Sequence, residues 1–131
     1  MATANLANSA TAIDTSKDSI VIVDNFQSIR GGFTLDVTGF APLVIMAGHV
    51  IIEETSTGQL KPMPVSGSAF GALPTGHTYA GIQINTVLTS RPFAGILVRG
   101  TVNPLAMPYT ATSILTALKA ALPMIDFRAD R

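Results

Sequence analysis

Two histidines and a pair of adjacent glutamates are the residues of this sequence that could perform acid–base chemistry or hold a metal ion. His49 lies in an apolar run, and we predict that it is a core or interface residue, whereas His77 follows a glycine and is predicted in a turn. Glu53 and Glu54 are expected on a strand, where neighbouring side chains point to opposite faces and cannot share a cation. The sequence contains no cysteine, which removes thiolate ligands and disulfides. We therefore expect no catalytic residue, no cofactor and no metal site.

Other short motifs carry little chemistry. The stretch AIDTS at 12–16 resembles the active-site turn of retroviral-type aspartic proteases, but it lies in a polar segment that lacks the core strands such a site needs. The motif RGG at 30–32 occurs once, and basic residues are not interleaved with aromatic ones, so we expect no nucleic-acid partner. The sequence has neither a P-loop nor a dinucleotide-binding glycine fingerprint. These observations predict a protein that is not an enzyme.

The composition indicates a surface that is partly buried by another protein. Charged residues make up 12% of the 131 residues and apolar residues 47%, whereas an average soluble domain has roughly 25% charged residues. The length fits one domain with a substantial core. A chain with so few solvating groups is expected to form an oligomer or to dock onto a larger assembly.

A membrane could also bury apolar surface, but the sequence argues against one. A spanning helix needs about 20 predominantly apolar residues. The charge-free run 37–52 is only 16 residues long and is interrupted by Gly39, Pro42 and Gly48. The first 18 residues lack the basic start and the apolar stretch of a signal peptide. We expect synthesis in the cytoplasm and no membrane partner.

Charge is unevenly distributed along the chain, although the net charge is zero. Residues 1–54 carry a net charge of −4, and residues 55–125 carry +4 without any acidic residue. Two interpretations remain open. Either the fold mixes the two regions on one surface, or opposite charges meet across a subunit interface and set its register and encounter rate.

The residue patterns predict a mainly β fold of the α+β class: a small mixed, barrel-like sheet with one C-terminal helix and a flexible N-terminal arm. Residues 1–17 are small and polar without a period, and we predict that they form this arm ahead of a single β-rich domain at 18–131. The β-branched run Asp18–Phe26 and the alternating run Arg30–Phe40 predict strands. These two could form a hairpin from 19 to 37 or be separated by a loop.

The middle of the chain is predicted to form a central strand that makes a hairpin with the segment after it. The apolar run Leu43–Ile52 is expected to form one strand, in which Gly48 indicates a bulge or a close backbone approach. Gly58 supplies a turn within the following stretch. Pro62 and Pro64 cannot donate to a ladder, so the second strand of this hairpin is predicted to be short or to lie at a sheet edge.

Two further strands are predicted at 77–88 and 92–103. Both contain an Ala-Gly pair, as does the run around Gly48, and we expect each of these glycines to mark a place where another backbone packs tightly.

A helix and a short C-terminal segment complete the prediction. The stretch 112–123 has Thr112 or Ser113 as a candidate N-cap and a proline at its end. Its apolar residues form one stripe, composed of Ile114, Leu115, Leu118 and Leu122. The alternating stretch 124–130 is expected to be a short last strand or an extended tail.

The order of these segments resembles the head decoration proteins of tailed bacteriophages, the family of the lambda capsid-stabilising protein. That family has a hairpin with a pattern like the one at 48–60, then two strands with small residues and glycines, a helix and a short last strand. The resemblance spans about Gly48–Asp130 and leaves the segment 18–40 unplaced. The matching residues are Gly48, Val50, Thr55, Gly58, Leu60, Gly81, Ile82, Leu97, Gly100 and Val102.

The resemblance implies a structural virion protein. It implies a homotrimer at the threefold positions of the outer capsid surface that clamps the major capsid protein and stabilises the expanded head, with an N-terminal arm that becomes ordered on the capsid. Two alternatives remain open: the base of a trimeric head fibre or surface adhesin, and a small β-fold enzyme or ligand-binding protein with a deep polar pocket.

Overall fold

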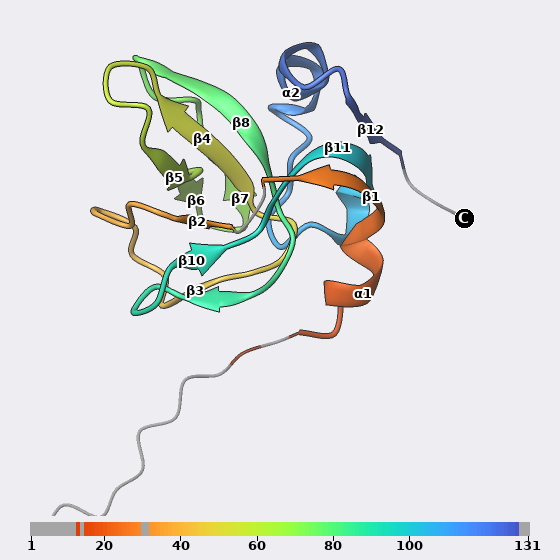
Figure 1. The fold of residues 1–131 in the computed structure, drawn as a ribbon, viewed down its shortest axis with the longest axis horizontal. Helices are drawn as coiled ribbons and strands as arrows, with labels where there is room; N and C mark the ends of the chain where they lie inside the picture. The colour runs from red at the N-terminus through yellow and green to blue at the C-terminus, as the bar shows by residue number, and fades with distance from the viewer. Residues whose placement is uncertain (1–12, 14, 30–31, 129–131) are drawn as a thin grey trace, which may run out of the picture.

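The computed structural model describes residues 13, 15–29 and 32–128 (Figure 1). Its strands are β1 (Ile22–Ser28), β2 (Phe33–Thr34), β3 (Val44–Ile45), β4 (Val50–Glu54), β5 (Leu60–Pro62), β6 (Val65–Ser66), β7 (Ala69–Phe70), β8 (His77–Gln83), β9 (Val87–Leu88), β10 (Phe93–Ala94), β11 (Ile96–Val102) and β12 (Ile125–Phe127). Its helices are α1 (Asp18–Val21), the 3₁₀ helix η1 (Pro104–Ala106) and α2 (Leu115–Ala121). The fold is mainly β with a C-terminal helix, as the sequence predicts.

The main sheet is organised around β11. Within the described residues the strand order is β1-β11-β8-β4-β5, and β12 pairs with β11 in parallel. β11 is antiparallel to β1 along its length, and it pairs with β8 near Ile96 and with β12 near Gly100. Outside this sheet, the described strands form separate two-stranded sheets: β2 with β10, β3 with β9, and β6 with β7.

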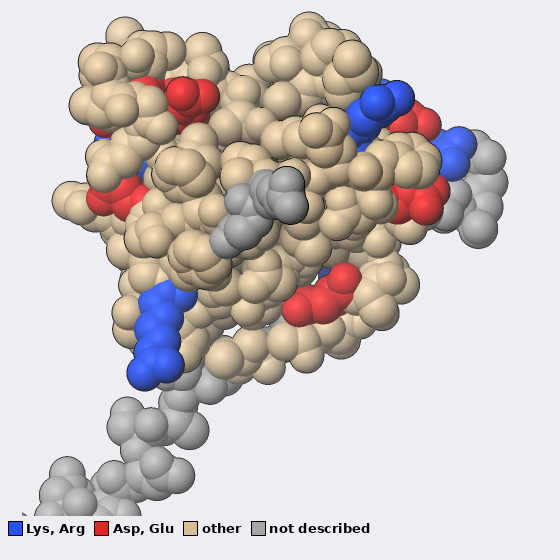
Figure 2. All heavy atoms as spheres, viewed as in Figure 1, with Lys and Arg blue, Asp and Glu red and all other residues tan. Residues whose placement is uncertain are grey.

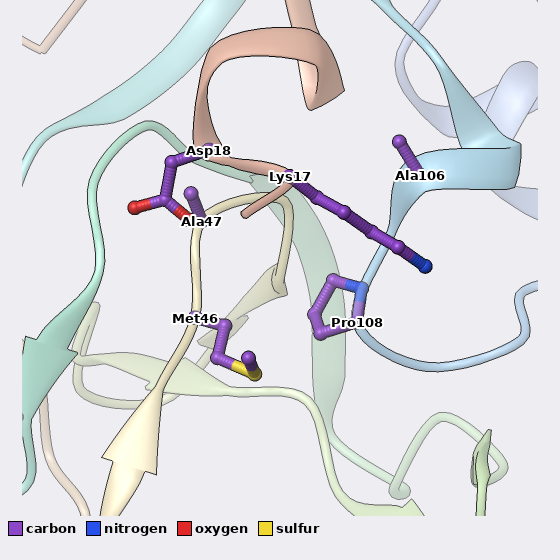
Figure 3. A pocket seen from close by; sticks show the side chains of 6 residues that line it. All are labelled: Lys17, Asp18, Met46, Ala47, Ala106 and Pro108. Carbon is purple, nitrogen blue, oxygen red and sulfur yellow. The ribbon is translucent and has the colours of Figure 1, made fainter. Parts of the chain in front are cut away.

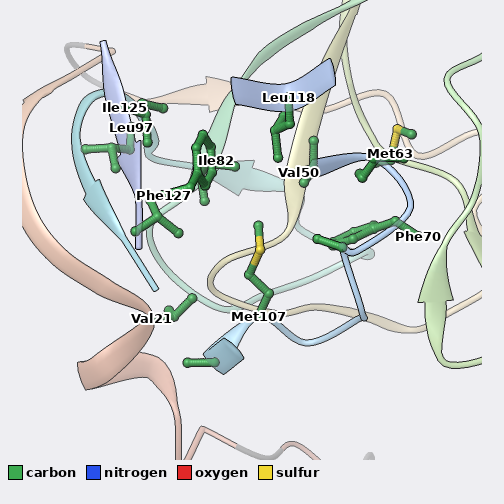
Figure 4. Packing of buried hydrophobic residues seen from close by; sticks show 14 of the residues in the cluster. Val21, Val50, Met63, Phe70, Ile82, Leu97, Met107, Leu118, Ile125 and Phe127 are labelled. Carbon is green, nitrogen blue, oxygen red and sulfur yellow. The ribbon is translucent and has the colours of Figure 1, made fainter. Parts of the chain in front are cut away.

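The centre of the sheet is buried on both faces, which explains the uninterrupted apolar run in β4. Val50 and Ile52 belong to one hydrophobic cluster, which α2 and η1 help to cover, whereas Ile51 belongs to a second cluster that includes Ile45 and Ile96. Figure 4 shows Leu118 extending from α2 towards Val50 in the first cluster. Because alternate side chains enter different clusters, each residue of β4 from Val50 to Ile52 is apolar and buried.

The predicted hairpin with Gly58 in its turn is confirmed. β4 and β5 are antiparallel, with Glu53 opposite Leu60, and Gly58 adopts a φ of +72° in the connecting turn. Among the described strands β5 pairs with β4 alone, so its position at the sheet edge is also confirmed. Pro62, the last residue of β5, and Pro64 after it fit this position because an edge strand can lack ladder donors.

The strand predicted at Asp18–Phe26 is confirmed only from Ile22 onward, and of the two alternatives for the next segment the hairpin is wrong. Residues 18–21 form the helical turn α1, in which the amides of Ile20 and Val21 donate to the carbonyl of Lys17, both at 3.0 Å. β1 begins only at Ile22 and pairs with β11, while β2 pairs with β10. Long-range pairing therefore replaces the local hairpin that the sequence pattern favoured.

The run Leu43–Ile52 does not form one strand. β3 and β4 are separated by a turn in which Gly48 has a φ of +89°, and a Cβ at this position would collide with the Cγ2 of Val21. A glycine is therefore required here by the turn and by the close approach of a side chain, and not by a bulge or another backbone.

The other two Ala-Gly pairs have different outcomes. A Cβ on Gly81 would lie 2.5 Å from the carbonyl oxygen of Leu97, so backbone packs tightly at this position as predicted. A Cβ on Gly95 would have no neighbour closer than 3.5 Å among the described atoms, so the same prediction is wrong there.

The end of the chain follows the predicted pattern except at the helix start. α2 begins at Leu115 with Ile114 as N-cap and without a side-chain cap, so neither Thr112 nor Ser113 caps it. The apolar stripe is confirmed, since Ile114 and Leu118 are buried and the other two members pack against the same cluster. The stretch after the helix forms the short strand β12, with Ile125 and Phe127 buried and the aspartate between them exposed.

The predicted N-terminal arm lies largely outside the described residues, which exclude 1–12 and 14. Its last residues lead into α1, where the amide of Asp18 donates to the carbonyl of Thr15 at 3.1 Å. Across the described part of the chain, the helices are too short to traverse a lipid bilayer.

Candidate interaction surface

His49 is a core residue, as predicted. Its side chain is fully buried, and Nε2 donates a hydrogen bond to the carbonyl oxygen of Met63 at 2.9 Å. The rings of Phe40, Phe70 and Tyr109 meet the imidazole edge-on, with centroids 5.4, 5.0 and 5.6 Å away. Nδ1 is left as an acceptor without a donor among the described residues. The ring has no access to a substrate, so its role is to join three segments of the interior.

Burial has a direct effect on the charge of this histidine. It lowers the pKa of His49 from 6.5 to about 4, because the charged form loses its hydration and the single bond to Met63 offsets only part of this loss. The imidazole is therefore neutral at physiological pH and cannot exchange a proton with a bound ligand.

Of the remaining candidates from the sequence, Glu54 and His77 lie opposite each other in the pairing of β4 with β8, whereas Glu53 is apart from them. His77 is the first residue of β8, directly after the turn at 75–76, and its Nδ1 lies 3.1 Å from the carbonyl oxygen of Thr75. Glu54 accepts a hydrogen bond from the Thr57 hydroxyl at 3.0 Å. Glu53 is its neighbour on β4 and points to the other side of the strand. Within the described residues, no group of three or more acidic or histidine side chains is placed to hold a metal ion.

Lys61 on β5 neutralises two carboxylates at once. Its Nζ lies 3.3 Å from Glu54 Oε2 and 3.7 Å from Asp36 Oδ2. Hydrogen bonds from Thr38 and then the lysine hold the pKa of Asp36 below its usual value, and Thr57 and Lys61 do the same for the pKa of Glu54. In this cluster the acidic and basic regions of the sequence meet within one chain.

Hollows of about 110 to 430 Å³ open on the described surface, and the one of about 430 Å³ is lined by small and apolar residues such as Phe70, Leu73 and Ile114. The hollow beside α1 measures about 110 Å³, and Figure 3 shows the Lys17 side chain running towards Ala106 and Pro108 while the Asp18 carboxylate points elsewhere. Asp18 accepts a hydrogen bond from the Thr86 hydroxyl at 2.8 Å, so its carboxylate holds α1 to a distant loop. This hollow is therefore a seam between packed segments.

A second hollow, of about 210 Å³, lies beside the Lys61 cluster. It is lined by the ion-paired Lys61 and Asp36, by Thr38 and His77, and by apolar groups such as Phe40 and Pro74. Lys61 and Asp36 are engaged with each other, the Thr38 hydroxyl donates to Asp36, and the His77 ring is bonded to the backbone of Thr75. Little polar capacity is left to fix a ligand.

Exposed apolar side chains are a more distinctive feature of this molecule. One group, which we call the turn patch, consists of Leu43, Leu88, Arg91 and Phe93. The exposed fractions of Leu43, Leu88 and Phe93 are 67%, 37% and 57%. Hydrogen bonds hold the patch together, since the amide of Thr89 donates to the carbonyl of Leu43 and that of Arg91 to the carbonyl of Leu88, both at 3.0 Å. The result is a group of exposed large apolar side chains with one guanidinium.

The second group, which we call the edge patch, consists of Ile20, Asp24 and Phe26 on α1 and β1. Ile20 is 52% exposed and Phe26 is 70% exposed. β1 lies at one end of the main sheet, and its residues from Asp24 to Gln27 are all exposed. Large apolar side chains on an exposed edge strand are typical of surfaces that contact another protein.

The space-filling view agrees with this description. In Figure 2 the acidic and basic side chains form a few separate spots, and most of the visible surface is neither acidic nor basic. The sequence missed these patches because Phe26 and Leu43 adjoin apolar runs and have the same composition as core residues. The polar neighbours of Phe26, Asn25 and Gln27, were the available signal.

Comparison with known proteins leaves the family open. No protein-family profile matches the chain, and no curated protein or solved structure matches it significantly. The resemblance to phage head decoration proteins therefore stays a prediction from the sequence.

Proposed function

We propose that this chain is a structural virion protein of a bacteriophage and not an enzyme. It is made in the host cytoplasm, binds the outer surface of the capsid as a homotrimer, contacts the major capsid protein and stabilises the expanded head. The sequence resemblance and the exposed apolar side chains of the surface support this proposal.

The observation that carries the proposal is the exposure of large apolar side chains, among them those of the turn patch and the edge patch. Leu43 and Phe26 are 67% and 70% exposed on a chain with 12% charged residues. Two patches are what a subunit needs if it contacts both its own copies and a shell beneath. Modest contacts suffice for this role, because many copies on one lattice add through multivalency.

The use of the polar side chains also supports a structural role. His49 is enclosed by aromatic rings, and Asp18 and Lys61 are bound to other parts of the chain. These groups stabilise the fold, and a cement protein needs little else from them. A protein that binds the expanded shell better than the unexpanded one stabilises the expanded state by mass action.

Residues 1–17 are the candidate segment for capsid binding. Their small polar residues match segments that become ordered when they bind a partner. The segment leads into α1 beside the exposed Ile20, so it starts from the edge patch.

The first test is the mass of the purified protein by light scattering, followed by sedimentation with heads built from the major capsid protein of the same genome. We expect three times 13.6 kDa in solution, and co-sedimentation with expanded heads in preference to unexpanded ones. A monomer that sediments with neither kind of head contradicts the proposal.

A truncation tests the role of the N-terminal segment. Deletion of residues 1–12 is expected to leave the fold and the trimer intact and to abolish addition to heads. The matched control replaces the same residues with a Gly-Ser linker of equal length, which should fail in the same way if the sequence of the segment matters. If the deletion variant still decorates heads, capsid binding belongs to another part of the surface.

A further inference from the structure

We propose that neighbouring subunits of the trimer contact each other head to tail, with the turn patch of one copy seated on the edge patch of the next. This inference depends on the proposed function, because it assigns the surfaces that make the homotrimer. A ring with threefold symmetry requires two different patches on each subunit, since a contact between identical patches closes a dimer.

The two patches have matching composition and opposite charge. The turn patch has three exposed apolar side chains and the guanidinium of Arg91, and the edge patch has two exposed apolar side chains and the carboxylate of Asp24. Each can therefore supply apolar contact area together with one charge that fixes orientation.

Within the described part of the chain, neither of these two charges has a counter-ion. Among the described residues, the ion pairs of the chain join Lys61 to Asp36 and Glu54, and Arg128 to Asp126. Arg91 and Asp24 take part in none of these pairs, and both are exposed. An exposed arginine surrounded by apolar side chains is a frequent anchor at protein interfaces, and a carboxylate on the facing patch completes it.

The patches also lie in places that a ring can use. In Figure 1, α1 and β1 are on the right of the molecule, whereas β3 and β10, which flank the turn patch, are at the lower left. The two patches are therefore on different sides of the subunit, as a head-to-tail contact requires, and a rotation of one third of a turn between copies closes the ring.

The irregularity of β1 favours side-chain contact over strand pairing. Its register with β11 shifts at three places between Ile22 and Ser28. Such bulges twist an edge strand and disfavour the addition of another strand. We therefore assign the contact to Phe26, Ile20 and Asp24, and not to a continuous sheet between subunits.

Charge reversal tests the assignment. Arg91→Glu and Asp24→Lys, each made alone in the full-length protein, are expected to weaken trimer formation at least tenfold, measured as the concentration of half-dissociation by analytical ultracentrifugation. The double variant carries both reversed charges, and it is expected to regain at least half of the lost affinity in logarithmic units. Lys119→Glu on the exposed part of α2 is the matched control and should leave the mass unchanged.

The outcomes separate this inference from the proposed function. If the wild-type protein is a trimer and the single variants remain trimers of equal stability, the head-to-tail contact is wrong while the capsid role stands. If Arg91→Glu leaves the trimer intact but prevents addition to heads, the turn patch faces the shell and the inference is overturned. If the wild-type protein is monomeric at every concentration, both proposals fail. Far-ultraviolet circular dichroism of each variant checks that the fold is retained.

Discussion

β5 and β1 lie at the two ends of the same sheet, and the side chains at these ends differ in how many partners they have within the chain. At the β5 end, Lys61 pairs with two carboxylates, the amide of Asp36 donates to the carbonyl of Leu60, and Pro62 removes a free donor. At the β1 end, Phe26 is 70% exposed and Asp24 takes part in no ion pair among the described residues.

The difference separates residues that stabilise the subunit from residues that are available to another molecule. Side chains of the β5 end find their partners within the chain, so their loss should lower stability. Side chains of the β1 end have few partners within the chain, so their loss should affect assembly instead. The following predictions test this division, from the largest expected effect on stability to the smallest.

Phe70→Ala should have the largest effect. Phe70 on β7 is 3% exposed and packs against His49 and Tyr109 in the hydrophobic cluster that also includes Val50 and Leu118. Removal of a buried phenyl ring leaves a cavity and is expected to cost about 3–5 kcal/mol of the free energy of unfolding. Urea denaturation at one protein concentration measures this loss, and a change below about 1 kcal/mol would mean that the cluster repacks freely.

Acid should weaken the same region through His49, whose Nε2 is bonded to the carbonyl just after β5. The pKa is about 4 in the folded state and 6.5 as its ordinary value. The folded state therefore binds fewer protons than the unfolded state between these values. The contribution of this pKa difference to the free energy of unfolding is complete above pH 6.5 and is lost as the pH drops towards 4. It amounts to roughly 3 kcal/mol.

Unfolding free energies measured from pH 7 to pH 4 check this expectation. His77→Gln is the control, because His77 lies outside the core and its loss should leave the acid dependence in place. A pH profile that is flat between 6.5 and 4.5 would show that the imidazole gains a proton without penalty. Asp36 and Glu54 also have a lowered pKa, and they add to the loss at the acid end of the range.

Lys61→Met should have a smaller effect. The lysine side chain is 26% exposed and its two partners are also partly exposed, so solvent screens both ion pairs. We expect a loss of about 1 kcal/mol or less, and a smaller loss at high salt. Lys119→Met on α2 serves as the matched variant, and an equal loss there would remove any special role for the Lys61 cluster.

Phe26→Ala should have the smallest effect on the stability of the isolated subunit. The ring has little packing to lose, and we expect a change within about 0.5 kcal/mol when unfolding is measured below the concentration at which subunits associate. The same variant should weaken assembly, in contrast to Phe70→Ala. A loss comparable to that at Phe70 would place this ring in the core and erase the difference between the two ends.

Local patterns in the sequence predicted the local parts of the fold. The β4–β5 hairpin has its turn glycine and its prolines within a few residues, and the stripe of α2 repeats over two turns, so both could be read directly. The start of α2 was predicted too early because its N-cap, Ile114, makes no side-chain cap and a threonine or serine nearby resembled one.

Long-range contacts were beyond the reach of these patterns. The partner of β1 is β11, with Ile22 opposite Val102, and no local period encodes such a pairing. The turn at α1 overrides a β-branched composition, and the Asp18 carboxylate that holds it bonds to Thr86. For the surface, composition predicted that apolar side chains would be exposed, but only the fold identified them as Phe26, Leu43 and Phe93.

The pairing of β1 with β11 also has a consequence during synthesis. Ile22 and Val102 are separated by 80 positions, so β1 leaves the ribosome long before its partner exists. At roughly 5–20 residues per second, this interval lasts about 4–16 s. Throughout it, the strand that carries Phe26 is bare on both sides and open to chaperones or to nascent neighbours on the same messenger RNA.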